Sequence, residues 1–292
     1  MQKAGFVNII GNPNAGKSTL MNALLGEKLS IVSPKAQTTR HRTFGILNED
    51  NCQIVFSDTP GIVNPSYKLH NEMLQMVNTS FEDADIILLI TDINEEGLKN
   101  NEIFEKLKQL EVPVIIVVNK IDLSTQDEAT KKIQQWQEIF PKADIIATSA
   151  LRKFNLQTVL EKIKEHLPEG TPFFPEDQLT DKPERFFAAE IIREKIFFRY
   201  QQEIPYCTEV QIESFKESDD IIRIHAIIFV ERKSQKAIII GQNGKMIKHL
   251  GIDARIEMEK FFKKKIYLDL FVKVDENWRN SDNALKKYGY KN

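Results

Sequence analysis

The sequence predicts two domains, a doubly wound α/β domain with a parallel sheet followed by a smaller α+β domain. From residue 5 to about residue 167, short apolar runs alternate with amphipathic helical stretches, which is typical of a parallel sheet covered by helices on both faces. Residues 168–183, PEGTPFFPEDQLTDKP, hold four prolines and a glycine and therefore favour a linker. The pattern changes after them. We assign residues 1–167 and 184–292 to the two domains.

Five apolar runs supply the predicted sheet of the first domain. They are FVNII, CQIVFS, DIILLITD, PVIIVVN and DIIATS. Most are unbroken, rich in β-branched residues and without polar alternation, as expected of strands that are buried on both faces. The helical stretches between them predict the crossover helices of a doubly wound fold.

The second domain begins with a predicted helix over residues 184–203. The segment TEVQIESF alternates strictly, and the polar turn ESDD joins it to the strand IIRIHAIIFVE, so we expect a hairpin. A basic helical segment, a Gly-x-x-Gly turn, a longer helix through Phe262 and the strand IYLDLFVKV follow. The order is that of a compact α+β unit.

Composition limits the class of protein. Apolar residues make up 41% and charged residues 28%, which is ordinary for a soluble globular protein. The net charge is −2, so attraction to a nucleic acid must come from a local patch. Cys52 and Cys207 lie far apart in apolar runs and predict buried thiols. We find no signal peptide and no apolar run long enough to span a membrane, and we expect a cytoplasmic monomer.

The stretch GNPNAGKST, Gly11–Thr19, directly follows the first apolar run and has the Gly-x4-Gly-Lys-Ser spacing of a phosphate-binding loop. Glycines let successive backbone N–H groups turn toward an anion, and the following helix adds its positive end. Lys17 would reach the β- and γ-phosphates, and the Ser18 hydroxyl would bind Mg²⁺. The predicted nucleotide contacts here are Gly11, Asn12, Pro13, Asn14, Ala15, Gly16, Lys17, Ser18 and Thr19.

The tetrapeptide NKID predicts that the base is guanine. It follows the run VIIVV, and Asp122 can accept two parallel hydrogen bonds from the N1–H and the exocyclic amine of guanine. Adenine offers no such pair, and an unpaired carboxylate would disfavour ATP strongly. We expect Asn119 to brace the loops and the Lys120 stem to lie along the ring. SAL, comprising Ser149, Ala150 and Leu151, ends the last strand, where backbone N–H groups can meet the guanine carbonyl.

The segment DTPG predicts the third part of the site. Asp58 would hold Mg²⁺ through a water, and the Gly61 N–H would contact the γ-phosphate, with Thr59 and Pro60 between them. The polar, poorly periodic segment SPKAQTTRHRT, residues 33–43, resembles a mobile switch. From it we choose Thr39 as the second hydroxyl on Mg²⁺, with Thr38 as the alternative. The predicted metal ligands are therefore Ser18, Thr39 and Asp58, and the predicted catalytic residues are Lys17, Thr39, Asp58 and Gly61.

The residue after DTPG is Ile62, which also borders the predicted nucleotide site. An isoleucine cannot orient an attacking water, whereas Ras-like GTPases have a glutamine there. Hydrolysis is therefore expected to be slow unless another group helps. Asn14 could ligate a K⁺ ion beside the phosphates, and such a cation would stabilise the transition state electrostatically. The alternative, that Asn14 only shapes the turn, stays open.

The turn GQNG, Gly241–Gly244, stands at the start of a predicted helix. In a type II KH fold, whose αββααβ order the second domain matches, such a loop lies close to the backbone of unpaired nucleotides. Residues 231–265 hold ten Lys or Arg against four Asp or Glu, as expected of a phosphate-binding face. The predicted RNA contacts are Gly241, Gln242, Asn243, Gly244, Lys245 and Lys248.

These motifs together resemble the Era-like GTPases, a family with a C-terminal KH domain. The resemblance covers essentially the whole chain, through GNPNAGKSTLMNALLG, KAQTTRHRT, DTPGI, NKID, SAL, AAEIIREKIFFRYQQEIPY and IIIGQNGKMIK. It implies GTP or GDP with Mg²⁺ as cofactors and slow GTP hydrolysis. It also implies binding to the 3′ end of small-subunit ribosomal RNA, a role in small ribosomal subunit assembly, and loose peripheral association with the inner membrane.

Three other classes of function fit the sequence less well. A tRNA-modifying partner of the TrmE type would need a cysteine near the C-terminus, but this chain ends KKYGYKN. A metabolic P-loop kinase is disfavoured by NKID and by the lack of an Arg-rich lid-like insertion. A plain RNA-binding module with a vestigial nucleotide site is disfavoured because Lys17, Ser18 and Asp58 are all present.

Overall fold

The computed structural model describes residues 2–49 and 51–291. Its contacts divide the chain into two compact units, Met1–Ser66 with His70–Asp181 and Tyr67–Leu69 with Lys182–Asn292. Within the described residues, no helix combines the length and the apolar character needed to cross a membrane.

The described part of the first unit contains a six-stranded sheet in the order β2-β3-β1-β4-β5-β6. Its strands are β1 (Lys3–Gly11), β2 (Thr43–Glu49), β3 (Cys52–Asp58), β4 (Ile86–Asp92), β5 (Val114–Asn119) and β6 (Asp144–Ala147). All neighbouring strands pair in parallel except β2 and β3, which are antiparallel. The doubly wound α/β prediction is confirmed, with a mixed rather than a wholly parallel sheet.

Sequence reasoning missed strand β2. The segment TFGILNE has no unbroken apolar run because it forms the edge of the sheet, and it contains a glycine, which weakens strand preference. The glycine has a packing reason. A Cβ built on Gly45 would lie 2.4 Å from Leu25 Cδ1, so the glycine makes room for the Leu25 side chain of helix α1.

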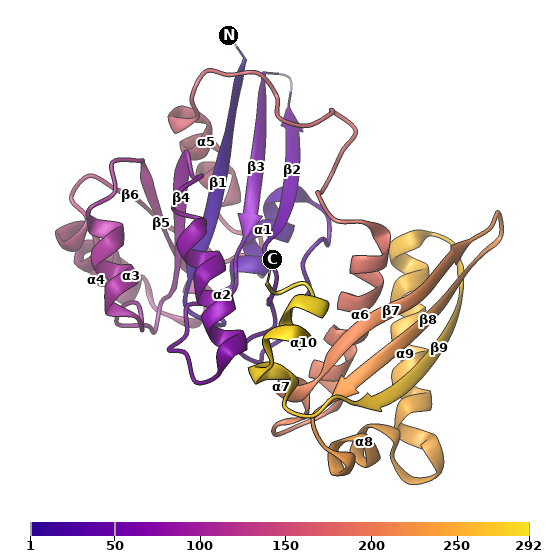
Figure 1. The fold of residues 1–292 in the computed structure, drawn as a ribbon. Coiled ribbons are helices and arrows are strands. Elements are labelled where there is room, and N and C mark those ends of the chain that lie inside the picture. Colours follow the sequence, from indigo (N-terminus) through magenta and orange to yellow (C-terminus); the bar gives the residue numbers. More distant parts are fainter. Residues whose placement is uncertain (1, 50, 292) are drawn as a thin grey trace. The chain divides into compact units, whose positions relative to one another are not determined.

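Helices cover both faces of this sheet (Figure 1). Helices α1 (Lys17–Leu25) and α5 (Leu156–His166) contact one face. Helices α2 (Lys68–Thr79), α3 (Asn101–Lys108) and α4 (Gln126–Ile139) lie on the other, where their apolar side chains share a core with Ile10, Leu89 and Val118. Thr125 and Glu128 form a capping box at the start of α4. The two side chains bond backbone N–H groups of the first turn and so fix where this helix begins.

The proline-rich segment 168–183 packs along the edge of the first unit for most of its length. The Ile46 N–H on β2 donates to Leu179 O at 2.9 Å. The Gln53 side chain donates to Phe174 O at 2.8 Å and accepts from the Phe173 N–H at 2.7 Å. The linker is therefore anchored to the first unit as far as Asp181.

The described part of the second unit has a three-stranded sheet, β7 (Glu209–Glu217), β8 (Ile221–Val230) and β9 (Lys265–Val274). Strands β7 and β8 form the expected hairpin, and β9 pairs with β8 in parallel. Helices α6 (Glu184–Arg199) and α9 (Lys245–Phe262) pack on the sheet and on each other, and α8 (Lys233–Ile240) precedes α9 (Figure 1). The order α6-β7-β8-α8-α9-β9 matches the αββααβ order on which the KH prediction rests.

Two details of the second unit differ from the sequence prediction. Helix α6 ends at Arg199 rather than at residue 203, because Tyr200 leaves the helical conformation and Gln202 is left-handed at φ 53°. The short helices α7 (Ile204–Cys207) and α10 (Asp282–Lys287) were not predicted. The buried indole of Trp278 donates to Cys207 O at 2.9 Å, and this bond holds the C-terminal segment against the unit.

Candidate functional site

The phosphate loop joins β1 to α1 and has backbone angles that only certain residues adopt. Gly16 has φ 102° and Asn14 has φ 65°. A Cβ on Gly16 would lie 2.2 Å from the Asn119 side chain, and one on Gly11 would lie 2.2 Å from Ile90 O. Glycine is therefore required at both ends of the loop, and the curled backbone leads directly into the N-terminus of α1.

Lys17 is buried beneath this loop. Its Nζ donates to Gly11 O at 3.0 Å and to Asn12 O at 2.8 Å. Burial lowers the pKa of Lys17 to about 8, although Asp58 and Glu95 act in the opposite direction. The loop's own carbonyls therefore hold the ammonium group at the floor of the predicted phosphate site.

The three predicted Mg²⁺ ligands lie together. Ser18 Oγ donates to Asp58 Oδ2 at 2.6 Å and lies 2.8 Å from Thr39 Oγ1. Burial raises the pKa of Asp58. Asp58 Oδ1 is buried without a hydrogen-bond partner among the described residues. Two hydroxyls and a carboxylate with an unused oxygen match the oxygen ligands that Mg²⁺ prefers.

The alternative threonine lies elsewhere. Thr38 Oγ1 donates to Lys35 O and lies 2.7 Å from Ser33 Oγ within the switch segment, so the structure brings Thr39 and not Thr38 to Ser18. Gly61 lies against the phosphate loop, where a Cβ would come 2.8 Å from Pro13 Cα.

The other DTPG residues face the interior of the unit. Thr59 Oγ1 donates to Ile9 O at 2.7 Å, and Pro60 is buried. Ile62 is fully buried in the core, and its N–H donates to Gly11 O at 3.1 Å. The Ile62 side chain is therefore packed in the core and not exposed to solvent.

The predicted base site joins three loops at the ends of β5, β6 and β1. The Asn119 amide donates to Ala15 O at 2.8 Å and accepts from the Ala150 N–H at 2.9 Å, so it braces the phosphate loop and the SAL loop at once. Ser149 Oγ donates to Asp122 Oδ1 at 2.5 Å. The Asp122 side chain is 22% exposed, and Leu151 is largely exposed.

Asp92 and Glu95 were missed by sequence reasoning. Lys120, left-handed at φ 65°, pairs with Asp92 at 2.7 Å, and this bond holds the pKa of Asp92 below its usual value although burial acts to raise it. Glu95 accepts from the Asp92 N–H at 3.2 Å, and burial raises the pKa of Glu95. The sequence did contain a signal for Asp92, because this residue ends a predicted strand. The other predicted site residues also lie at the carboxyl ends of the strands.

Asn14 lies at the outer side of the phosphate loop. Its Nδ2 donates to Pro34 O at 3.0 Å, so the side chain connects the phosphate loop to the switch segment. Thr19, the last predicted contact of the loop, lies in the first turn of α1 and is half-buried.

In the second unit, the GQNG loop joins α8 to α9. A Cβ on Gly241, at φ 71°, would lie 2.4 Å from Met246 Cγ, so glycine allows the two helices to meet. Asn243 and Gly244 are left-handed at φ 53° and 73°, and the space beside the Gly244 Cα is open. Gln242, Lys245 and Lys248 are exposed next to it. The loop therefore offers a backbone surface with adjacent positive charge.

Comparison with known proteins gives two family matches. A model described as a 50S ribosome-binding GTPase matches residues 6–120, and a model described as a KH domain matches residues 203–279.

Relatives match along the entire chain. GTPase Era of Clostridium kluyveri is 45% identical over 293 residues, covering 100% of both proteins. GTPase Era of Staphylococcus haemolyticus is 42% identical and covers 99% of this chain and 97% of its own.

Two solved structures share the fold over their full lengths, each with a TM-score of 0.95 and 40% identity. One is Era in complex with MgGDPNP and nucleotides 1506–1542 of 16S ribosomal RNA. The other is a single-residue variant of Aquifex aeolicus Era bound to GDP and AlF4⁻.

Proposed function

Because the chain belongs to the Era family of GTPases, we propose that it is a GTP-hydrolysing switch that binds the 3′ end of small-subunit ribosomal RNA and assists assembly of that subunit. The observation that carries the proposal is the likeness, along the whole chain, to an Era structure that holds both MgGDPNP and 16S ribosomal RNA. The description of the first family model names the 50S ribosome, but that model covers only residues 6–120. The full-length Era structure, which holds 16S ribosomal RNA, supports a role at the small subunit.

In this proposal the first unit binds and hydrolyses GTP. The backbone N–H groups of the phosphate loop and Lys17 would hold the β- and γ-phosphates, and Ser18, Thr39 and Asp58 would hold Mg²⁺. Bound Mg²⁺ supplies positive charge that offsets the charge developing on the phosphate oxygens. The Gly61 N–H would face the γ-phosphate from the loop that packs on Pro13.

The base would be selected by Asp122, with Asn119 and the backbone of Ser149, Ala150 and Leu151 around it. Asn119 already bonds the loops on both sides, so the base site is braced by protein contacts. Lys120, held by Asp92, would place its stem along the ring plane. Such bracing reduces the ordering cost of nucleotide binding.

Hydrolysis is predicted to be slow and to depend on potassium. Ile62 is buried and cannot orient water, whereas Asn14 lies exposed between the phosphate loop and the switch segment. Replacing Na⁺ with K⁺ should raise the rate about tenfold or more, and Asn14→Ala should remove that difference. Phosphate release is measured in the two salts, with GTP affinity measured in both as the control. Equal rates in the two salts would exclude a potassium role for Asn14.

The RNA-binding face is the GQNG loop with Lys245, Lys248 and the surrounding positive charge. We expect single-stranded RNA carrying the 3′ end of small-subunit ribosomal RNA to bind there, with an affinity that falls steeply as salt rises.

If the two units act as a switch, RNA affinity should differ between the GTP and GDP states. A coupling of about 1–3 kcal/mol is typical, and nucleotide affinity must change by the same factor when RNA is present. We expect residues 33–43 to order on the γ-phosphate and to change how the 168–183 segment positions the KH domain. The test is RNA affinity with GDP and with a non-hydrolysable GTP analogue. Equal affinities would leave two independent binding domains.

Finally, we propose that the protein acts as a monomer in the cytoplasm, bound to the small subunit and associated peripherally with the inner membrane. Membership of the Era family supports the proposed cytoplasmic location. Sedimentation of a lysate with GTP analogue or GDP would test it, because the protein should move with small subunits and a minor fraction with membrane vesicles. Exclusive association with large subunits would contradict the proposal.

A further inference from the structure

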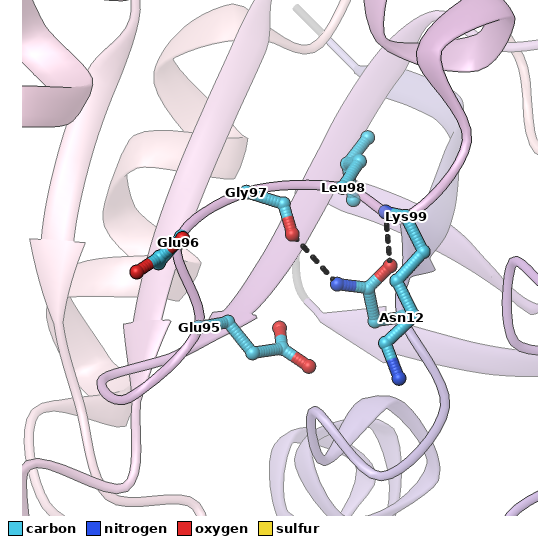
Figure 2. Close-up of a pocket in the computed structure, with 6 residues that line it drawn as sticks. All are labelled: Asn12, Glu95, Glu96, Gly97, Leu98 and Lys99. Carbon is cyan, nitrogen blue, oxygen red and sulfur yellow. Dashed lines mark hydrogen bonds between the residues drawn. The ribbon is translucent and has the colours of Figure 1, made fainter.

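A hollow of about 470 Å³ lies beside the phosphate loop (Figure 2). It is lined by Asn12, Glu95, Glu96, Gly97, Leu98 and Lys99. Residues 93–100, which we call the β4–α3 loop, form one wall, and the side chain of Asn12 points into them from the phosphate loop. Two segments far apart in the sequence therefore meet through one side chain.

Both ends of the Asn12 amide are bonded to that loop. Its Nδ2 donates to Gly97 O at 2.8 Å, and its Oδ1 accepts from the Lys99 N–H at 3.0 Å (Figure 2). Asn12 is only 1% exposed. Neither bond follows from the phosphate-loop motif, in which position 12 can be any residue. An asparagine suits the position because it offers one donor and one acceptor to two backbone groups.

The β4–α3 loop is itself held at several points. Leu98 packs into the core on one side of the sheet, and Asn100 caps helix α3 by accepting from the Ile103 N–H at 3.1 Å. The Ile93 N–H donates to Asn119 O at 3.0 Å. The loop is therefore a fixed support that connects the base site with the phosphate site.

On the phosphate side, Asn12 reaches Lys17 through its backbone. Its carbonyl accepts from Lys17 Nζ at 2.8 Å, the shorter of the two bonds that hold the ammonium group. We propose that the Asn12 side chain is a positioning residue, which fixes the phosphate loop to the β4–α3 loop and thereby holds Lys17 at the β- and γ-phosphates. This inference rests on the proposed binding of guanine nucleotides at this site.

The proposal makes a specific distinction between ligands. Lys17 would contact the β- and γ-phosphates, so loss of the Asn12 bonds should weaken the binding of GDP and GTP. The binding of guanosine, which has no phosphate, should stay unchanged. A merely structural role would weaken all three alike. Asn12→Ala removes both bonds. Asn12→Asp keeps the shape and the acceptor for Lys99 but sets an oxygen against Gly97 O.

The experiment measures displacement of a fluorescent GDP by GDP, GTP and guanosine, with thermal unfolding recorded for every variant. Asn12→Ala should weaken the affinity for GDP and GTP about tenfold, the effect of losing two ordinary hydrogen bonds. The affinity for guanosine should stay within about twofold of the wild-type value. Asn12→Asp should weaken GDP and GTP at least as much, and it gives the answer if the alanine variant does not fold. Glu96→Gln is the control, because Glu96 is exposed and lines the same hollow. This variant should bind GDP, GTP and guanosine within about twofold of the wild-type affinities.

The outcomes separate this inference from the proposed function. If the wild-type protein does not bind GDP, the proposed function fails. If the wild-type protein binds GDP and either Asn12 variant matches it, or if guanosine weakens as much as GDP, the nucleotide site stands and the positioning role of Asn12 is wrong.

Discussion

Asp122→Asn is expected to weaken GDP and GTP binding about 100-fold or more and to create binding of xanthine nucleotides. The carboxylate would lose two charge-assisted hydrogen bonds to guanine, at about 1.5 kcal/mol or more each. An asparagine amide can instead donate to the carbonyl that xanthine carries in place of the guanine amine. Ser149 already orients Asp122 Oδ1, so the substituted side chain should stay in place.

The measurement is displacement of a fluorescent GDP by GTP, ATP and xanthosine triphosphate. Asp127→Asn is the matched control, because it removes the same charge from an exposed position in the first turn of α4. The control should bind as the wild type does. If ATP displaces GDP from the wild-type protein as well as GTP does, guanine selection by Asp122 is wrong.

Gly244→Asp is expected to abolish RNA binding while the second unit stays folded. Apart from its two chain neighbours, no described residue has an atom within 4 Å of a Cβ built on Gly244, so the new side chain has room within the protein. It would instead occupy the space where the RNA backbone must approach and place a negative charge beside a phosphate. The same change at Gly241 would be a poor test, because a Cβ there would collide with Met246.

Gly244→Ala is the control that separates charge from backbone strain. The left-handed φ of 73° costs either substitution about 1 kcal/mol, whereas only aspartate adds the negative charge. RNA affinity is measured by fluorescence anisotropy at two salt concentrations, with thermal unfolding as the folding check. The alanine variant should bind with a modest loss. Wild-type affinity in Gly244→Asp would place the RNA elsewhere on the molecule.

Much of the proposed nucleotide site could be assembled from the sequence because its chemistry depends on local sequence. A phosphate loop needs glycines, a lysine and a hydroxyl at set spacings, and parallel strands bring their carboxyl ends to one edge of the sheet. Asn119 and Asp122 could therefore be placed near the loop from the residue pattern alone. The apolar runs likewise predicted β1, β3, β4, β5 and β6, because strands that are buried on both faces leave an unbroken apolar pattern.

Two features of the first unit depend on tertiary contacts that the residue pattern does not carry. Strand β2 lies at an edge, so its apolar pattern is incomplete, and its place depends on pairing with β3 and on the bond from the Ile46 N–H to Leu179 O. The choice between Thr38 and Thr39 depends on which hydroxyl the folded switch segment turns toward Ser18. Neighbouring threonines look alike in sequence, and only the path of the backbone distinguishes them.

The sequence by itself determined the fold class, the motifs that predict the nucleotide and the loop expected to contact RNA, because each depends on residue types at fixed short spacings. The tertiary structure alone decided which side chains support those motifs. Asp92 holds Lys120, and Asn12 holds the β4–α3 loop 85 residues away. Such bonds join a side chain to a backbone group or to a distant charge, and a backbone N–H or carbonyl looks the same at nearly every position of a sequence.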